Sequence, residues 1–205
     1  SGCFFLLTPI FLQNNDKIVI IKIIFCNEHA LTFSPPLAIL RKKSLGDLIM
    51  EKALIGMSGG VDSSVAAFLT QQAGYACIGA TMRLFSNDVL GEDQQSTCCS
   101  LDDVEDAKSV ARRMGMPHYT FNFQDAFRET VMDKFVRCYE RGDTPSPCID
   151  CNRYLKFGTL LHRAQELGCQ YVVTGHYARI RRDPDTGRCL LYKAADKAKD
   201  QTYFL

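Results

Sequence analysis

The sequence predicts an α/β fold: a doubly wound parallel sheet with helices on both faces, followed by a C-terminal β-hairpin. Three observations support this prediction. From residue 50 onward, short apolar runs alternate with segments of helical periodicity. Glycine or proline stands at most junctions, where it ends a helix or starts a turn. The first apolar run leads through a glycine-rich turn into a helix, an order typical of such sheets.

The elements are expected in alternating order. We expect strands at the run beginning with Leu54 and at residues 76–82, 118–123 and 171–174, helices after residue 64 and at residues 102–114, 124–141 and 152–167, and hairpin strands at residues 178–182 and 188–193. Gly115, Gly142 and Gly168 end three of these helices. Ligands of such sheets bind at the carboxyl ends of the strands, where Ser58, Met82 and Gly175 are expected to lie.

Composition is consistent with one folded α/β domain, alone or with an appendage. Of the 205 residues, 46% are hydrophobic and 23% charged, so enough apolar side chains are present for a core. A net charge of +1 neither predicts nor excludes a nucleic-acid partner. Ten cysteines without a convincing secretory signal favour a reducing compartment, and we expect a cytoplasmic protein.

Residues 1–49 differ in character from the rest. Polar residues 13–17 and Lys22 interrupt their apolar runs, so neither run provides the roughly 20 apolar residues of a membrane-spanning helix, and no membrane association is expected. We interpret residues 1–49 as an extension, with Met50 as the natural start and upstream open-reading-frame translation before it. A genuine extension or targeting segment is the alternative. We divide the remainder into residues 50–177, a catalytic domain, and residues 178–205, the hairpin and the start of a further region.

The turn after the first strand has the features of a phosphate-binding loop. Gly59 and Gly60 let backbone N–H groups approach an anion, and the following helix N-terminus adds partial positive charge. Asp62, Ser63 and Ser64 add polar side chains at the same turn. It is not a Walker loop, because the Gly-Lys-Ser/Thr ending is absent. A glycine-rich turn without a ligand is the alternative.

A second candidate site is the pair Cys148-x-x-Cys151. It follows the stiff loop at residues 144–147, where a helix is expected to begin, and Arg153 lies two residues beyond. A helix N-terminus stabilises a thiolate, which favours a reactive cysteine. The spacing alone also fits a redox pair, half of a zinc site, part of an iron–sulfur site or a buried pair. Cys98 and Cys99 are interpreted as core or loop residues.

Several motifs carry a resemblance to a known family. They are Ser58-Gly59-Gly60-x-Asp62-Ser63, the segment Thr144-Pro145-x-Pro147-x-x-x-Cys151-Asn152, Lys156-Phe157, Thr174-Gly175-His176-Tyr177 and Lys199-Asp200-Gln201-x-Tyr203-Phe204-Leu205. The first resembles the PP-loop of ATP pyrophosphatases, whose domains are Rossmann-like and adenine-nucleotide-binding. The five in this order resemble the bacterial tRNA-uridine 2-sulfurtransferase family (MnmA/TrmU), and the likeness extends from about Met50 to the last residue.

The resemblance implies 2-thiolation of the anticodon wobble uridine in tRNAs for Lys, Glu and Gln. In that family ATP adenylates the uracil 2-oxygen, and persulfide sulfur then displaces AMP. The implied partners are tRNA and a sulfur donor, either a cysteine desulfurase or a sulfur-relay protein. Mg²⁺ is expected with ATP, because it offsets charge developing on pyrophosphate.

The resemblance also implies roles for particular residues. The residues expected to bind ATP are Gly56, Met57, Ser58, Gly59, Gly60, Val61, Asp62, Ser63, Met82 and Gly175. Those expected to contact tRNA are Ser146, Pro147 and Cys148, near the target base, and Lys199, Asp200 and Gln201. Cys151 is the expected nucleophile, with Cys148 and Asp62 as further catalytic residues. His176 is either a catalytic base or a structural histidine.

Two departures from the family pattern affect these expectations. Position 148 often holds aspartate in the family, whereas Cys148 adds a second thiol here. The family's persulfide-carrying cysteine and a β-rich tRNA-holding region are expected beyond Leu205. Cys148 and Cys151 are therefore candidate ligands of an iron–sulfur cluster with a third, distant cysteine. We favour the alternative, a metal-free pair that resolves a persulfide by forming a disulfide.

Two other functions remain open on the sequence. Another PP-loop enzyme, such as an NAD or GMP synthetase relative, would share the phosphate loop but gives no reason for the Cys151 loop or the Lys199-Asp200-Gln201 ending. A non-catalytic nucleotide- or RNA-binding protein is the second alternative. Release of pyrophosphate from ATP that depends on cognate tRNA would separate all three.

Overall fold

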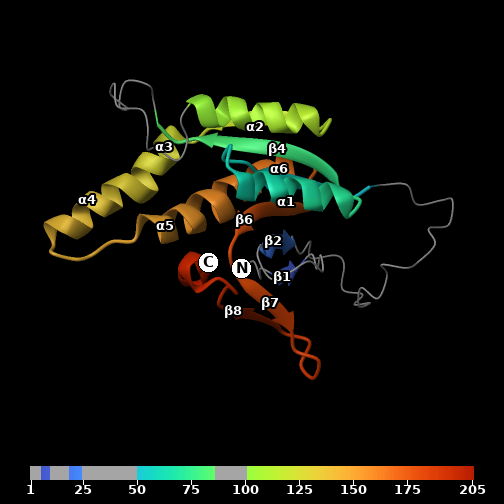
Figure 1. Cartoon of the computed structure of the whole chain (residues 1–205). Coiled ribbons are helices and arrows are strands. Elements are labelled where there is room, and N and C mark those ends of the chain that lie inside the picture. The colour runs from blue at the N-terminus through green and yellow to red at the C-terminus, as the bar shows by residue number, and fades with distance from the viewer. Residues whose placement is uncertain (1–5, 10–18, 25–49, 86–100) are drawn as a thin grey trace.

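A computed structural model describes residues 6–9, 19–24, 50–85 and 101–205 (Figure 1). Six strands form the main sheet, in the order β1-β2-β6-β3-β4-β5. They are β1 (Leu6–Pro9), β2 (Val19–Ile24), β3 (Lys52–Gly56), β4 (Ala76–Arg83), β5 (His118–Asn122) and β6 (Tyr171–His176). Strands β3, β4, β5 and β6 run parallel, which confirms the predicted parallel sheet. β3, which leads into the glycine-rich loop, lies between β6 and β4.

The two N-terminal strands join this sheet in antiparallel orientation. β2 pairs with β6 from Val19 opposite His176 to Ile24 opposite Tyr171, and β1 pairs with β2. The described parts of residues 1–49 therefore extend the sheet, which is mixed rather than wholly parallel. The proposed start at Met50 and the division at residue 177 stay predictions.

Helices cover both faces of the sheet, as the doubly wound prediction requires (Figure 1). They are α1 (Val61–Gln72), α2 (Leu101–Arg113), α3 (Gln124–Phe127), η3 (Arg128–Met132), α4 (Asp133–Glu140), α5 (Pro147–Asp150), η4 (Cys151–Thr159) and α6 (Leu160–Glu166). Alternate strand residues point to opposite faces. Ile55 and Val173 pack in one core with α1 and α2, whereas Leu54 and Val172 pack in a second core with η3, η4 and α6.

The helix that carries the cysteine pair has one turn before its periodic segment. Apolar periodicity predicted a helix over residues 152–167, and the proline-containing loop predicted a helix start directly after residue 147; helical backbone begins at Pro147. Proline is favoured at the first helical position, because its fixed φ suits the helix and its missing N–H has no partner there. The consequence is that Cys148 lies in the first turn and Cys151 one turn further on.

The middle of this helix, η4, is π-helical. Leu160 N–H donates to the Leu155 carbonyl five residues earlier, and the Thr159 hydroxyl donates to the Tyr154 carbonyl at 3.1 Å. A wider turn of this kind is uncommon in helices and frequent at functional sites. It re-aims the side chains that follow Cys151 relative to a regular α-helix.

The C-terminal part forms the predicted hairpin, from β7 (Arg179–Arg182) and β8 (Cys189–Tyr192). Two short 3₁₀ turns follow, η5 (Lys197–Lys199) and η6 (Thr202–Phe204). Within the described ranges, no helix combines the length and the apolar character that crossing a membrane requires.

Candidate functional site

A cavity of about 520 Å³ opens at the carboxyl ends of the parallel strands. It lies between the loop after β3, the end of β6, the cysteine helix (α5, η4 and α6) and the C-terminal turns (η5 and η6). Its lining residues are Gly56, Met57, Ser58, Asp62, Ser63, Met82, Leu84, Phe127, Pro147, Cys148, Cys151, Asn152, Lys156, Leu160, Thr174, Gly175, His176, Gln201 and Phe204. The expected meeting of Ser58, Met82 and Gly175 at this edge of the sheet is found.

The glycine-rich loop is braced by its own serines. The Ser63 hydroxyl donates to the Gly60 carbonyl at 3.0 Å and accepts from the Ser58 N–H at 3.2 Å, so this side chain spans the loop. The Ser64 hydroxyl also donates to the Gly60 carbonyl, at 2.9 Å. At its start, the Met57 N–H donates to the Ala80 carbonyl of β4 at 2.8 Å. The loop is thus fixed before any ligand arrives.

Two glycines are required by close backbone contacts. Gly59 has a φ of +79°, and a β-carbon there would lie 2.6 Å from the carbonyl oxygen of Asp103 in α2. A β-carbon on Gly175 of β6 would lie 2.8 Å from the backbone carbonyl of Asp62. By contrast, a β-carbon on Gly56 or Gly60 would meet nothing nearer than 3.5 Å or 3.6 Å.

The amino end of α1 is suited to an anion. Gly60 precedes the helix in extended conformation, and no side chain caps it. The first N–H groups of a helix have no intrahelical acceptor, and the helix dipole adds partial positive charge there. Ser58 of the preceding loop and Asp62 and Ser63 of this helix line the cavity, so the residues present fit a bound phosphate chain.

Cys148 of α5 and Cys151 of η4 line the same cavity, across from the glycine-rich loop. Cys148 is exposed and Cys151 half-buried, and neither forms a disulfide, nor do Cys77, Cys138 and Cys169. Between them Asp150 is buried, with 5% of its surface exposed, and accepts a 2.6 Å hydrogen bond from Lys134 Nζ of α4. This ion pair anchors the cysteine helix to α4. Cys98 and Cys99 lie outside the described residues.

The described residues alone do not complete the ligand set of an iron–sulfur cluster, whose third cysteine is expected beyond Leu205. Nowhere in the described ranges do three His, Cys, Asp or Glu side chains gather closely enough to hold a metal ion. Two thiols leave a cluster short of protein ligands. Mg²⁺ that accompanies ATP needs fewer protein ligands, because one or two carboxylates together with the phosphates and water complete its coordination. Asp62 supplies one carboxylate at the cavity.

His176 is a buried neutral histidine at the cavity wall. Burial, together with the nearby Lys156 charge, lowers its pKa to about 3. Its Nδ1 lies 2.8 Å from the Thr174 hydroxyl, and its ring lies near those of Phe157 and Phe204. A group with so low a pKa is a weak base near pH 7. These surroundings favour the structural alternative for His176.

The C-terminal turns form the remaining wall. The Gln201 N–H donates to the Tyr177 carbonyl at 3.0 Å, and Gln201 Oε1 accepts from the Tyr177 N–H at 2.9 Å. Asn152, beside Cys151, donates from Nδ2 to the Phe204 carbonyl at 2.9 Å. Asn152 is buried, with 2% of its surface exposed, and its Oδ1 has no hydrogen-bond partner among the described residues. The wall is therefore held by side-chain contacts to both the strand and the cysteine helix.

The structure brings most of the predicted site residues together. The predicted residues absent from the lining are Gly59, Gly60, Val61, Ser146, Lys199 and Asp200. Asp200 instead accepts hydrogen bonds within its own turn, from Ala194 N–H at 2.7 Å and the Thr202 hydroxyl. Sequence reasoning missed Leu84, Phe127 and Leu160, whose apolar side chains carry no chemical signal. It quoted Tyr177 in a motif without a role, yet the Tyr177 hydroxyl donates to Asp62 Oδ1 at 2.6 Å.

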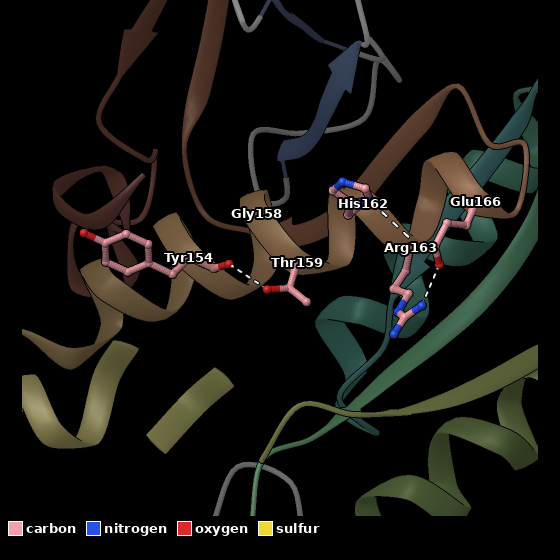
Figure 2. A pocket seen from close by; sticks show the side chains of 6 residues that line it. All are labelled: Tyr154, Gly158, Thr159, His162, Arg163 and Glu166. Carbon is pink, nitrogen blue, oxygen red and sulfur yellow. Dashed lines mark hydrogen bonds and ion pairs between the residues drawn. The ribbon is translucent and has the colours of Figure 1, made fainter. Parts of the chain in front are cut away.

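A second hollow, of about 440 Å³, lies along the outer side of η4 and α6 (Figure 2). Its lining residues are Tyr154, Gly158, Thr159, His162, Arg163 and Glu166. Arg163 Nη1 is paired with Glu166 at 2.6 Å, and none of the predicted site residues reaches this hollow. The functional site is therefore assigned to the cavity at the strand ends.

Taken with the fold, this cavity defines a nucleotide-binding α/β domain that carries a pair of thiols opposite its phosphate loop. The family model described as "tRNA methyl transferase HUP domain" matches residues 51–205. The chain belongs to this family.

Two curated relatives carry the same name. The chain is 52% identical over 155 residues to "tRNA-specific 2-thiouridylase MnmA" of Clostridioides difficile (strain 630), covering 76% of this chain and 43% of that protein. It is also 52% identical over 168 residues to the protein of that name in Symbiobacterium thermophilum, covering 80% of this chain and 43% of the relative. The chain thus spans less than half the length of these relatives. A solved glutamine-dependent NAD⁺ synthetase from Acinetobacter baumannii aligns with a TM-score of 0.40, at 21% identity, over 58% of this chain and 20% of that one, and this likeness carries no functional argument.

Proposed function

We propose that the protein to which this chain belongs performs ATP-dependent 2-thiolation of the wobble uridine of tRNA. One observation carries the proposal: a single cavity is lined by Ser58 and Asp62 of the glycine-rich loop and by both thiols, Cys148 and Cys151. An enzyme that only adenylates its substrate needs the glycine-rich loop alone. Transfer of sulfur to the activated atom needs the loop and a thiol within reach of the same substrate. The name shared by these two relatives agrees with this chemistry.

The activation step is assigned to the loop side of the cavity. The loop from Gly56 to Ser63 binds the phosphates, and Met82 and Gly175 contact the adenosine. The uracil 2-oxygen attacks the α-phosphorus, the bond to the β-phosphate breaks, and pyrophosphate leaves. Mg²⁺ held at Asp62 would offset the charge that develops on pyrophosphate. The uncapped amino end of α1 stabilises the same charge.

The sulfur step is assigned to the cysteine side. Terminal persulfide sulfur attacks C2 of the activated uracil, and AMP leaves with the former 2-oxygen. The Cys151 thiolate then attacks the cysteine sulfur that carried the persulfide. The bond between that cysteine sulfur and the sulfur on the base breaks, and a disulfide forms between Cys151 and the cysteine that carried the persulfide. The released electron pair leaves sulfur on the base as a thiocarbonyl. Cys148 is placed to exchange into this disulfide, and an external thiol must reduce it before the next turnover.

The proposed partners follow from these steps. Ser146, Pro147 and Cys148 contact the target base, and Lys199, Asp200 and Gln201 contact the tRNA. A cysteine desulfurase or a relay protein supplies the persulfide sulfur, and the protein acts in the cytoplasm. Residues 50–177 act as the catalytic domain, and residues 178–205 begin the region that holds tRNA.

Pyrophosphate release tests the proposal. The protein as its gene encodes it is incubated with ATP and a tRNA transcript that has uridine at the wobble position, and the same transcript with cytidine there is the control. We expect release only with uridine. Asp62→Ala abolishes it, whereas Cys151→Ser retains release but forms no 2-thiouridine by mass spectrometry. Release that is independent of tRNA would favour another PP-loop ligase, and no release with any acceptor would favour a non-catalytic binding role.

A further inference from the structure

Tyr177 connects three parts of the molecule that the sequence places far apart. It follows β6, and its hydroxyl donates to Asp62 Oδ1 at 2.6 Å, across 115 positions of the chain. Its main chain exchanges two hydrogen bonds with Gln201, at 2.9 and 3.0 Å. Lys199 Nζ lies 5.3 Å from the centre of its ring, a cation–π distance. Tyr177 is thus the link between the C-terminal turns and the phosphate loop.

The bond to Asp62 fixes the direction of a carboxylate. A 2.6 Å O–H···O⁻ bond is short and charge-assisted, a class about twice as strong as neutral hydrogen bonds. It uses Oδ1, and the second oxygen, Oδ2, takes no part in it.

We propose that Tyr177 is a positioning residue for the ATP step: its hydroxyl orients the Asp62 carboxylate toward metal-bound phosphates, and Gln201 holds Tyr177 in place. This proposal rests on the proposed function for the meaning of the ATP step. It also gives the Lys199-Gln201 segment a role in addition to RNA contact, because that segment supports the residue that orients Asp62.

Binding of ATP without RNA isolates this role. The probe is α,β-methylene-ATP, which keeps all three phosphates but cannot be cleaved between the first two, and its Kd is measured by calorimetry with and without Mg²⁺. Tyr177→Phe keeps the ring and the main-chain bonds and loses only the hydroxyl. We expect its Kd with Mg²⁺ to rise about tenfold, the loss expected for one hydrogen bond to a charged group. Without Mg²⁺, its Kd stays within twofold of wild type.

Two further variants test whether the change in ATP affinity is specific to Tyr177 and whether it depends on Gln201. Tyr203→Phe makes the same chemical change on an exposed neighbour in the same turns, and its Kd matches wild type. Gln201→Ala removes the acceptor of the Tyr177 N–H and weakens Mg²⁺-dependent binding in the absence of RNA. An unchanged Kd for Gln201→Ala would restrict Gln201 to RNA contact and overturn its supporting role.

A double-mutant cycle decides whether Tyr177 acts through Asp62. Asp62→Asn keeps the size of the side chain and removes its charge. If Tyr177 orients that charge, Tyr177→Phe adds less than twofold in the Asp62→Asn background. Additive effects, or equal losses with and without Mg²⁺, would show a merely structural role and overturn the proposal. Wild-type pyrophosphate release with tRNA, measured in parallel, tests the proposed function separately: its absence would defeat that function while these binding data still decide the role of Tyr177.

Discussion

Gly175 shows how a single missing side chain shapes this site. Its backbone lies against the carbonyl of Asp62, where a β-carbon would come within 2.8 Å. Gly175→Ala therefore displaces the first turn of α1 and the Asp62 carboxylate with it. We expect at least a tenfold weaker Kd for Mg²⁺-ATP, measured by calorimetry, together with a lower melting temperature.

The matched control is Gly60→Ala in the same site. Gly60 has negative φ, and the nearest atom to its added β-carbon is the Ser58 hydroxyl at 3.6 Å. We expect its melting temperature to stay closer to wild type than that of Gly175→Ala. A Gly175→Ala protein as stable and as tight-binding as wild type would contradict the close contact.

An ion pair contributes to the docking of the helix that carries the two thiols. Lys134 of α4 neutralises the buried Asp150 between the two thiols, and Lys134→Ala leaves that carboxylate without its cation. Loss of a partner from a fully buried pair costs about 3–5 kcal/mol, and half-exposed Lys134 is screened by solvent, so we expect a loss of about 1 kcal/mol. Urea denaturation measures it.

Lys108→Ala is the control for that experiment, because Lys108 pairs with Glu105 at an exposed position. Its unfolding free energy should change less than that of Lys134→Ala. Equal effects of the two variants would mean that the pair between Lys134 and Asp150 contributes no more than an ordinary surface pair.

At the scale of elements, the sequence located the strands better than the helix that carries the thiols. Apolar runs bounded by glycine, such as that before Gly56, predict buried strands wherever they lie. The first turn from Pro147 to Asp150 has no helical periodicity of apolar side chains, so only the prolines before it indicated a helix start there. The π-helical stretch depends on main-chain bonds such as that from Leu160 to Leu155, and no side-chain pattern reports them.

Contacts between segments far apart in the chain also could not be predicted from the sequence. The PP-loop motif predicted the phosphate side of the cavity, and the resemblance predicted Cys148 and Cys151 beside it. The pairing of β2 with β6 and the bond from Tyr177 to Asp62 join residues more than 100 positions apart. Tertiary packing determines such contacts, so a local sequence pattern cannot predict them.

For the whole molecule, buried His176 predicts a pH dependence of stability. Its pKa in the folded protein, about 3, lies below the ordinary value near 6.5, so the unfolded chain binds a proton first as the pH falls. This contribution to the unfolding free energy is complete above pH 6.5 and falls by up to about 1.4 kcal/mol per pH unit toward pH 3. Burial also lowers the pKa of His118, which acts in the same direction.

His176→Gln tests this dependence, because glutamine fills a similar volume but does not titrate. The difference in unfolding free energy between wild type and variant, from urea denaturation at pH 7.5 and 5.0, should shift in favour of the variant at the lower pH. A difference that does not vary with pH would show that His176 keeps an ordinary pKa in the folded protein.

The backbone contacts at Gly59 and Gly175 have a consequence for how such a chain can evolve. A side chain that blocks a new β-carbon can rotate away, but Asp103 and Asp62 block these positions with main-chain atoms. A substitution at either glycine is tolerated only if a whole helix moves at the same time, which a single mutation rarely achieves. Drift should therefore spare both glycines longer than Gly56, whose neighbours would allow alanine, and distant descendants should remain recognisable by them.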